Sequence, residues 1–494
     1  MHKIQQPGQT LSGADFFCGG GGSTCGMIQV PDVSISIAIN HWQQAIETHQ
    51  HNHPQTKHVI TDLQNTHPST VPKTVFAWFS PECVNHSNAK GRRRIGLDQK
   101  SLWDDGSNDS AAERSRATMR EVVEFSAYHR YQFVIVENVS EIRYWAHYNS
   151  WLTAMHNLGY NHQEIYLNSM FALPVPQSRD RIYVCFWRAN NKAPDLNITP
   201  RAWCPRCECD VHAQWWAKSN PLPGRVRYRK SYIYICPKCA HSGYRDGTQI
   251  EVHPYRYAAY NAIDWTQRTE PIGNRKRPLS VKTMERIQRG INKFKNTSYI
   301  LEQNKEKPEG PHRIIPLEDN FVANHNRVPA AFISGYWSST NTNKGIHQPL
   351  STMVASGSHH SLVLPGGFLN GMWRGNPNRD LSQPISTITT SGHHALVMPF
   401  ISTYYNNGGL KDVTEPLPTA TTKDRHGLIQ PTISWEIRDC GFRMLQPNEI
   451  KLAMGFPPDY TILGSKSDQI RQAGNAVTPP VAKLLLERMI KTLD

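Results

Sequence analysis

The chain has 494 residues, ten cysteines and a formal net charge of +14. This length suggests two to four domains, and the positive charge favours an anionic partner, above all nucleic acid. No apolar run is long enough to cross a bilayer, and the opening MHKIQQPGQT lacks the apolar core of a signal peptide. We therefore expect a soluble, cytoplasmic protein with no membrane partner, whose cysteines do not form a disulfide framework.

Strand-like and helix-like runs alternate in the amino-terminal part of the chain. Short runs rich in apolar, β-branched or aromatic residues predict strands at 32–40, 74–80, 131–138 and 181–187. Apolar residues at helical spacing predict helices over 111–130 and from Trp151 to Leu158, the second ending at Gly159. This alternation predicts an α/β fold in which helices cover a doubly wound, mostly parallel sheet.

The first strand-to-helix turn has the sequence DFFCGGGGSTCGM, from Asp15 to Met27. Its glycines allow a ligand to approach the backbone closely and leave amide groups free at the start of a helix. The segment is not a phosphate-binding loop, because no Lys-Ser or Lys-Thr pair follows the glycines. A glycine cluster alone is also compatible with a simple tight turn.

A cysteine opens a polar and strongly basic loop in FSPECVNHSNAKGRRR, Phe79 to Arg94. Cys83 follows a predicted buried strand, so it stands at the carboxyl end of a strand, where ligands bind in open α/β sheets. A lone cysteine at a strand end is more often structural, since free cysteine is a small, buried hydrophobe. The GRRR run is either an ordinary basic loop or a set of phosphate contacts.

The glycine-rich turn and the cysteine loop can be interpreted together with four further segments. These are VENVS (136–140), QSRDR (177–181), RMLQPNEIKLAMGFPPDY (443–460) and GNAVTPPVAKLL (474–485). Together and in this order, the segments resemble the motifs of the DNA cytosine-5 methyltransferase family. The resemblance implies the Rossmann-like fold of methyltransferases that depend on S-adenosylmethionine, with a smaller DNA-recognition domain. It also implies that the last motif forms a helix that packs beside the glycine loop.

The resemblance assigns chemical roles to four residues. Cys83 would supply the thiolate that adds to carbon 6 of cytosine, which makes carbon 5 able to attack a methyl group. Glu137 would contact ring nitrogen 3 and the exocyclic amine, and Arg179 and Arg181 would orient that carboxylate and the base carbonyl. The target base would have to be flipped out of the duplex.

The resemblance also implies the residues that bind S-adenosylmethionine. Phe17 and Trp42 would pack on the adenine, and Asp62 would bind its amine. The full predicted set is Phe17, Gly19, Gly21, Gly22, Trp42, Asp62, Asn475 and Val477. Three residues depart from the family pattern: Glu82 replaces a second proline, Val84 replaces glutamine, and His41 stands where an acidic residue usually binds the ribose.

Beyond Trp187 the composition changes, and two CxxC pairs appear in WCPRCECD and ICPKC. Four thiolates in two such pairs favour a structural zinc ion held by Cys204, Cys207, Cys236 and Cys239, as in a zinc ribbon, with Cys209 spare. Reduced, unligated cysteines and a redox role are the alternatives. Arg225, Arg227, Arg229 and Lys230 alternate along a predicted strand, one face of which we expect to contact phosphates.

From residue 330 the chain repeats itself in HQPLSTMVASGSHHSLVLP, SQPISTITTSGHHALVMP and EPLPTATTKDRHGLIQP. Each repeat follows a segment rich in aromatic residues, asparagine and glycine. The repeated histidines are His359, His360, His393, His394 and His426, and we favour turn or phosphate contacts over a metal site for them. In the order of the family, these repeats form the target-recognition region.

We therefore expect a catalytic domain at 10–188 completed by 441–494, a zinc-ribbon-like insertion at 189–250 and a recognition domain at 251–440. The predicted function is site-specific methylation of double-stranded DNA by a monomer in a bacterial cytoplasm, or in a bacterium that carries a phage, and a cognate restriction endonuclease is a possible partner. Two alternatives remain at this stage. One branch of the family methylates cytosine in transfer RNA, and a catalytically silent DNA-binding protein could keep the same fold.

Overall fold

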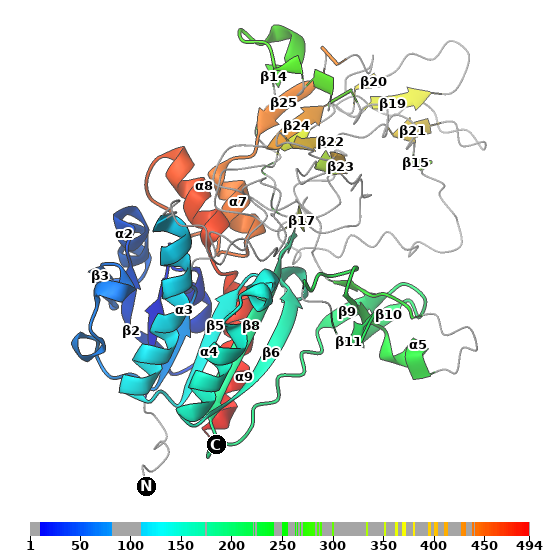
Figure 1. Cartoon of the computed structure of the whole chain (residues 1–494). Coiled ribbons are helices and arrows are strands. Elements are labelled where there is room, and N and C mark those ends of the chain that lie inside the picture. Colours follow the sequence, from blue (N-terminus) through cyan, green and yellow to red (C-terminus); the bar gives the residue numbers. More distant parts are fainter. Residues whose placement is uncertain are drawn as a thin grey trace, which may run out of the picture.

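A seven-stranded sheet with helices packed on it forms the lower part of the protein in Figure 1. The computed structural model describes residues 10–81, 110–172, 175–220, 222, 225–241, 249–254, 437–438, 440–493 and parts of 262–288, and it describes strands between 299 and 430 as backbone only. The strand order is β3-β2-β1-β4-β5-β8-β6. These strands are β1 (Leu11–Phe16), β2 (Val33–Asn40), β3 (Lys57–Ile60), β4 (Phe76–Phe79), β5 (Phe133–Asn138), β6 (Tyr160–Asn168) and β8 (Asp180–Arg188).

The direction of the strands confirms the predicted fold class. Strands β1 to β5 pair in parallel, whereas β8 is antiparallel to both β5 and β6. Every residue of β4 (FAWF) and β5 (FVIVEN) is buried, as expected for central strands covered on both faces. Each of the four predicted strands is present, as β2, β4, β5 and β8.

Helices cover both faces of this sheet. Helices α3 (Ser110–His129) and α4 (Tyr148–Asn157) lie over the front face in Figure 1, and α9 (Pro479–Met489) lies behind it. Helices α1 (Gly22–Met27) and α2 (Gln43–Asn52) follow β1 and β2 directly. The predicted helix stop is Gly159, which adopts a φ of 85° just after α4. Short 3-10 turns connect the elements: η1 (Leu63–Asn65), η2 (Pro68–Thr70), η5 (Ser140–Tyr144), η6 (Ser169–Phe171), η8 (Ile272–Asn274) and η9 (Ile490–Thr492).

The carboxyl-terminal segment returns to the sheet through β25 (Gly441–Met444), α7 (Pro447–Ala453), α8 (Lys466–Asn475) and α9. Capping boxes define where two of these helices begin, Gln446 with Glu449 for α7 and Ser465 with Asp468 for α8. Helix α9 begins with Pro479 at a position where a missing N–H costs nothing. The carboxyl end of α9 lies near the bottom of Figure 1, opposite α7 and α8.

Between β8 and the carboxyl-terminal segment, the chain first forms a small β-rich module. It contains β9 (Arg201–Cys204), β10 (Cys209–His212), β11 (Gln214–Ala217), β12 (Tyr232–Ile235), α5 (Pro237–His241) and β13 (His253–Pro254). Strand β13 pairs with β9, so the module extends a few residues past the predicted boundary at 250. We call residues 201–254 the zinc module, for the cysteine cluster described below.

The repeats of the sequence are also repeats of the backbone. Strands β16 (Phe332–Ile333), β19 (Phe368–Gly371) and β22 (Phe400–Thr403) each pair with the next histidine-bearing segment, as β18 (Ser361–Val363), β21 (His394–Leu396) and β24 (His426–Gln430). All three pairs are antiparallel and share one register, in which Ile333 faces Leu362, Leu369 faces Leu396, and Ile401 faces Leu428. Each sequence repeat therefore supplies one equivalent strand pair.

The remaining strands join these pairs to the rest of the chain. Strands β14 (Glu270–Pro271), β23 (Leu410–Asp412) and β25 extend the sheet of β16, β18, β22 and β24, and β15 (Tyr299–Ile300) and β20 (Arg379–Asp380) extend that of β19 and β21. Strand β17 (Leu350–Ser351) pairs in parallel with β7 (Gln177–Ser178). No helix in the described part of the chain is long and apolar enough to cross a membrane.

Candidate active site

The glycine-rich turn after β1 combines left-handed backbone with a buried carboxyl group. Phe17, Gly19 and Gly21 have φ angles of 58°, 53° and 91°. Asp15 is fully buried, and its Oδ2 accepts hydrogen bonds from Ser23 Oγ (2.6 Å) and Thr24 Oγ1 (2.7 Å) at the start of α1. Burial raises the pKa of Asp15 to about 6, although the two hydroxyl donors act in the opposite direction. These bonds fix the turn between β1 and α1.

The carboxyl-terminal segment packs directly on this turn. A Cβ added to Gly22 would lie 2.1 Å from the carbonyl oxygen of Val477, so only glycine permits this approach. Tyr460 Oη donates a 2.6 Å hydrogen bond to the carbonyl of Gly20. Asn475 is exposed at the end of α8, and Val477 is buried two residues later. The predicted residues from both ends of the chain therefore lie together.

The next two predicted cofactor residues follow β2 and β3. Trp42 is half-buried, and the guanidinium of Arg471 lies 4.2 Å from the centre of its ring, so one face of the ring is covered by a cation. The Nδ1 of His41 lies 3.9 Å from Oδ1 of Asp62. His41, which stands where the family usually has an acidic residue, therefore lies beside the carboxylate of Asp62, just after β3.

The turn has room for a ligand of the expected kind. A Cβ added to Gly19 would meet no atom within 4 Å, so open space lies over the centre of the loop. Aromatic and carboxylate side chains at Trp42 and Asp62 provide groups suited to an adenosine. The residues present therefore fit S-adenosylmethionine.

A buried ion pair lies at the carboxyl end of β5. Arg181 Nε donates a 2.8 Å hydrogen bond to Oε1 of Glu137, and the two side chains are 9% and 11% exposed. The neighbouring Asn138 Nδ2 lies 3.5 Å from the carbonyl oxygen of Pro81, two residues before Cys83. The start of the cysteine loop is thereby held beside the strand that carries Glu137.

Arg179, the other predicted arginine, is buried close enough to Glu137 for their charges to interact, and it also contacts the carboxyl-terminal segment. Its two terminal nitrogens donate to the carbonyl oxygens of Gly474 (3.2 Å) and Ala476 (3.1 Å). Burial, and then the charge of Arg181, lowers the pKa of Arg179 to about 9, which still leaves the side chain charged at neutral pH. The described hydrogen bonds of Arg179 thus hold the turn between α8 and α9, next to the glycine loop.

Several predicted residues lie outside the described part of the chain. They include Cys83, Glu82, Val84 and the GRRR run, all within 82–109. The side chains of the recognition repeats, including their five histidines, lie outside it as well.

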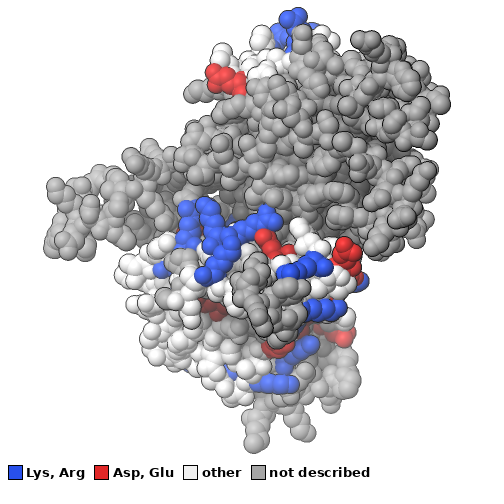
Figure 2. All heavy atoms as spheres, turned by 90° about the vertical axis from the view of Figure 1, so that its right-hand side faces the viewer, with Lys and Arg blue, Asp and Glu red and all other residues white. Residues whose placement is uncertain are grey.

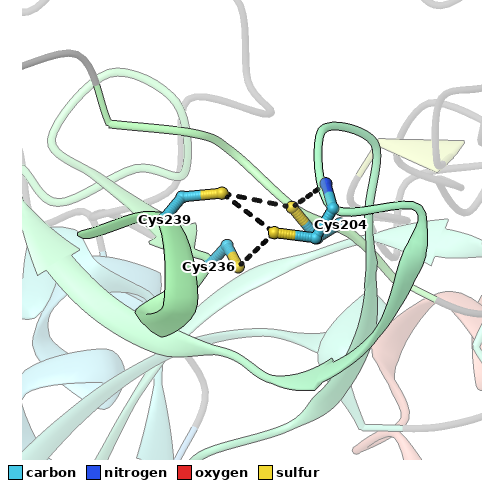
Figure 3. A group of neighbouring side chains, drawn as sticks. Cys204, Cys236 and Cys239 are labelled. Carbon is cyan, nitrogen blue, oxygen red and sulfur yellow. Dashed lines mark hydrogen bonds between the residues drawn. The ribbon is translucent and has the colours of Figure 1, made fainter. Parts of the chain in front are cut away.

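The four predicted zinc ligands come together in the zinc module. The Sγ atoms of Cys204, Cys207, Cys236 and Cys239 all lie within 4.8 Å of one another, and three of the separations are 3.8, 3.8 and 3.2 Å. Figure 3 shows the side chains pointing toward a common centre. Tetrahedral zinc with bonds of about 2.3 Å places its sulfur ligands about 3.8 Å apart. The cluster therefore fits a zinc ion, and Cys209 instead accepts from Lys238 Nζ at 3.4 Å.

The prediction of a strand at Arg225 to Lys230 was wrong, whereas phosphate contact by these residues stays a prediction. These residues form a turn before β12, and three of the side chains face carboxylates. Arg225 Nε and Arg227 Nη2 lie 2.7 and 3.7 Å from Oε1 of Glu141, and Arg229 Nε lies 2.6 Å from Oε1 of Glu251. Lys and Arg still outnumber Asp and Glu on the described surface of this face (Figure 2). Alternation of charged residues alone did not distinguish a strand face from a paired turn.

A family model for the C-5 cytosine-specific DNA methylases matches residues 11–491. The chain belongs to this family. The match spans the glycine turn, the Glu137–Arg181 pair, the zinc module and the carboxyl-terminal helices, so the family of methyltransferases is shown for nearly the whole chain.

Individual relatives of this C-5 cytosine methylase are distant. A segment of 59 residues is 39% identical to the type II methyltransferase M.MspI of Moraxella sp, which corresponds to 11% of this chain and 14% of that protein. A mutant DNMT2 of Spodoptera frugiperda aligns over 97% of this chain and 100% of its own, with a TM-score of 0.47 and 12% identity. The Entamoeba histolytica methyltransferase EhMeth aligns over 98% and 99%, with a TM-score of 0.46 and 12% identity.

Sequence reasoning missed several residues that shape this methylase site. Glu141, Asp180 and Arg471 were not singled out, because each depends on a contact with a residue far along the chain. Asp15 was not singled out either, although its partners Ser23 and Thr24 are only eight and nine residues away. Glu141 lies just after VENVS and Asp180 lies inside QSRDR. The presence of an acidic residue in or next to each of these two segments could have marked Glu141 and Asp180 as candidates.

Proposed function

We propose that the protein transfers a methyl group from S-adenosylmethionine to carbon 5 of cytosine in double-stranded DNA. The observation that carries the proposal is the buried pair of Glu137 and Arg181 at the carboxyl end of β5, beside the segment that leads into Cys83. A buried carboxylate held by an arginine is suited to bind a polar base edge in a dry pocket. The net charge of +14 supports a polyanionic substrate.

In this proposal, Cys83 starts the reaction by adding its thiolate to carbon 6 of the ring. Glu137 shares a proton with nitrogen 3 and accepts from the exocyclic amine, which relieves the negative charge that the addition places on the ring. Carbon 5 then takes the methyl group, and S-adenosylhomocysteine is left as the product. Loss of the carbon 5 proton to water breaks the bond between sulfur and carbon 6 and releases the Cys83 thiolate. Because ring carbons of a paired cytosine are out of reach, the base must be flipped into the site.

Arg181 and Arg179 position two different parts of the proposed site. Arg181 orients Glu137 through the 2.8 Å contact to Oε1. Arg179 holds the carbonyl oxygens of Gly474 and Ala476, so it connects the catalytic segment to the end of the cofactor site. We therefore propose Arg179 as a positioning residue rather than as a ligand of the base.

The cofactor supplies an electrophilic methyl group on a sulfonium. Phe17, Gly19, Gly21 and Gly22 would form the floor of its site. Trp42 and Asp62 would contact the adenine, and Asn475 and Val477 would close the far side.

A trapping experiment tests the proposal. Wild-type protein, S-adenosylmethionine and duplex DNA that carries 5-fluorocytosine should give a covalent adduct, because fluorine at carbon 5 blocks the last elimination. Cys83→Ser should form no adduct while it still binds DNA and cofactor. An adduct in the serine variant would contradict the nucleophile, and methylation of transfer RNA but not of DNA would contradict the substrate. Mapping of methylated cytosines in DNA from expressing cells would then give the target sequence.

A further inference from the structure

Two acidic side chains join the zinc module to the segments that carry the proposed catalytic residues. Glu141 lies four residues after Glu137, and Asp180 lies between Arg179 and Arg181. Both face the turn from Arg225 to Ser231 that precedes β12. The described contacts of this turn are thus made with the proposed catalytic segments and within the module.

Asp180 is the first junction. Its Oδ1 accepts from the backbone N–H of Tyr228 (3.1 Å), from Oη of Tyr232 (3.2 Å) and from Asn168 Nδ2 (3.1 Å). On the main chain of the same residue, the carbonyl oxygen accepts a 2.8 Å hydrogen bond from Nη1 of Arg181. Asp180 therefore connects the module to the arginine that holds Glu137.

Glu141 is the second junction. The side chain is only 10% exposed, and its Oε1 lies 2.7 Å from Arg225 Nε and 3.7 Å from Arg227 Nη2. Its Oε2 accepts from Ser140 Oγ at 3.2 Å, within the segment that follows Glu137. A buried carboxylate requires these cations, since an unpaired buried charge is strongly unfavourable.

The turn that makes both junctions is continuous with the metal cluster. It is closed by hydrogen bonds from the Ser231 N–H to the Arg227 carbonyl (2.7 Å) and from the Arg227 N–H to Ser231 Oγ (3.1 Å). Strand β12 follows at once and ends next to Cys236, one of the four clustered thiols. The ring of Phe171, just before the QSRDR segment, packs on Tyr228 and Tyr234 at centroid distances of 5.2 and 4.2 Å.

We propose that the zinc module is a positioning element for catalysis, which acts through Tyr228 and Tyr232 on Asp180 and through Arg225 on Glu141 to fix the Glu137–Arg181 pair. This inference rests on the proposed function of that pair. It differs from a role in DNA binding alone, because Asp180 and Glu141, which receive polar contacts from the turn and from Tyr232, both lie on the catalytic segments. Small displacements of positioned groups cost rate, about a hundredfold for 1 Å.

Removal of single hydroxyl and charge contacts tests the inference. Tyr232→Phe loses only the donor to Asp180, and Glu141→Gln keeps its volume but loses the charge that pairs with Arg225. The matched control is Tyr234→Phe, since Tyr234 lies on the same face of β12 and is equally buried. For each protein, the single-turnover rate of methylation would be measured at saturating DNA and S-adenosylmethionine, together with zinc content, melting temperature and cofactor affinity.

We expect Tyr232→Phe and Glu141→Gln to lower the single-turnover rate and the rate of adduct formation with 5-fluorocytosine DNA by about ten- to a hundredfold. Zinc content and affinity for S-adenosylmethionine should stay unchanged, and Tyr234→Phe should match the wild type. Wild-type rates in both variants, or losses that follow zinc content or melting temperature, would overturn the positioning role while leaving the proposed function intact. A wild-type protein that neither methylates nor traps cytosine would overturn the proposed function itself, and the positioning role with it.

Discussion

Replacement of Asp15 by asparagine tests how the glycine turn is stabilised. Asp15 is fully buried, and its Oδ2 accepts from both Ser23 and Thr24. Burial raises the pKa of this carboxyl from 3.8 to about 6. The folded state therefore binds the proton more tightly than the unfolded chain does. As the pH rises from about 4 to about 6, the unfolded chain gives up its proton first, so stability is lost over this interval.

The size of the effect follows from the shift. One pKa unit corresponds to about 1.4 kcal/mol, so a shift from 3.8 to about 6 costs the folded state about 3 kcal/mol once the carboxyl is ionised. Asparagine can accept the same two hydrogen bonds through its amide oxygen without a charge, and its amide nitrogen replaces Oδ1, which is buried and has no hydrogen-bond partner in the described part of the chain. That buried donor costs the variant a constant amount at every pH. Relative to the wild type, we therefore expect Asp15→Asn to gain about 3 kcal/mol in stability between pH 4 and pH 7.

Urea unfolding at pH 5, 6, 7 and 8, followed by tryptophan fluorescence, would measure this difference. The decisive quantity is the change in the free energy of unfolding between variant and wild type as a function of pH. A difference that does not vary with pH, or one that shrinks as the pH rises, would refute the reasoning about the buried carboxyl.

Two further predictions concern the two ends of the cofactor site and the metal. Gly22→Ala should force the turn away from Val477, because the added Cβ would lie 2.1 Å from its carbonyl oxygen; we expect a loss of about 1 to 3 kcal/mol in stability and at least tenfold weaker binding of S-adenosylmethionine by calorimetry. Gly159→Ala, where the Cβ would meet only Arg188 Nη1 at 3.8 Å, is the control and should leave cofactor affinity unchanged, and equal affinity in both variants would speak against the contact. Metal analysis should find about one zinc per chain, and Cys204→Ser and Cys239→Ser should lose it whereas Cys209→Ser keeps it. Retention of zinc in all three would exclude this ligand set.

Local patterns predicted the central fold well. The apolar runs at 74–80 and 131–138 could hardly be anything but buried strands, and the spacing in 111–130 and before Gly159 was that of helices. The sequence did not reveal that β8 runs antiparallel to its neighbours, because direction depends on the connection rather than on the strand itself. Strands β3 and β6 escaped notice because polar residues interrupt them.

The site was predictable only to the level of motifs. Spacing alone identified the four clustered cysteines, since two CxxC pairs favour a metal by themselves. The partner of Arg179 was not predictable, because its described hydrogen bonds go to Gly474 and Ala476, nearly three hundred residues away. The ion pairs of Arg225 and Arg227 were not predictable for the same reason, because their partner Glu141 lies on another element.

The bond from Tyr460 to Gly20 joins residues 440 positions apart, and this separation has a consequence for how the protein is made. At about 5 to 20 residues per second, a ribosome needs roughly 20 to 90 seconds to add that stretch of chain. During this time the glycine turn is already synthesised but lacks the segment that packs against it. Closing so long a loop costs only slightly more entropy than closing a loop of half its length. A nascent chain can nevertheless form the contact that packs its carboxyl-terminal segment on the glycine turn only after Tyr460 has been synthesised.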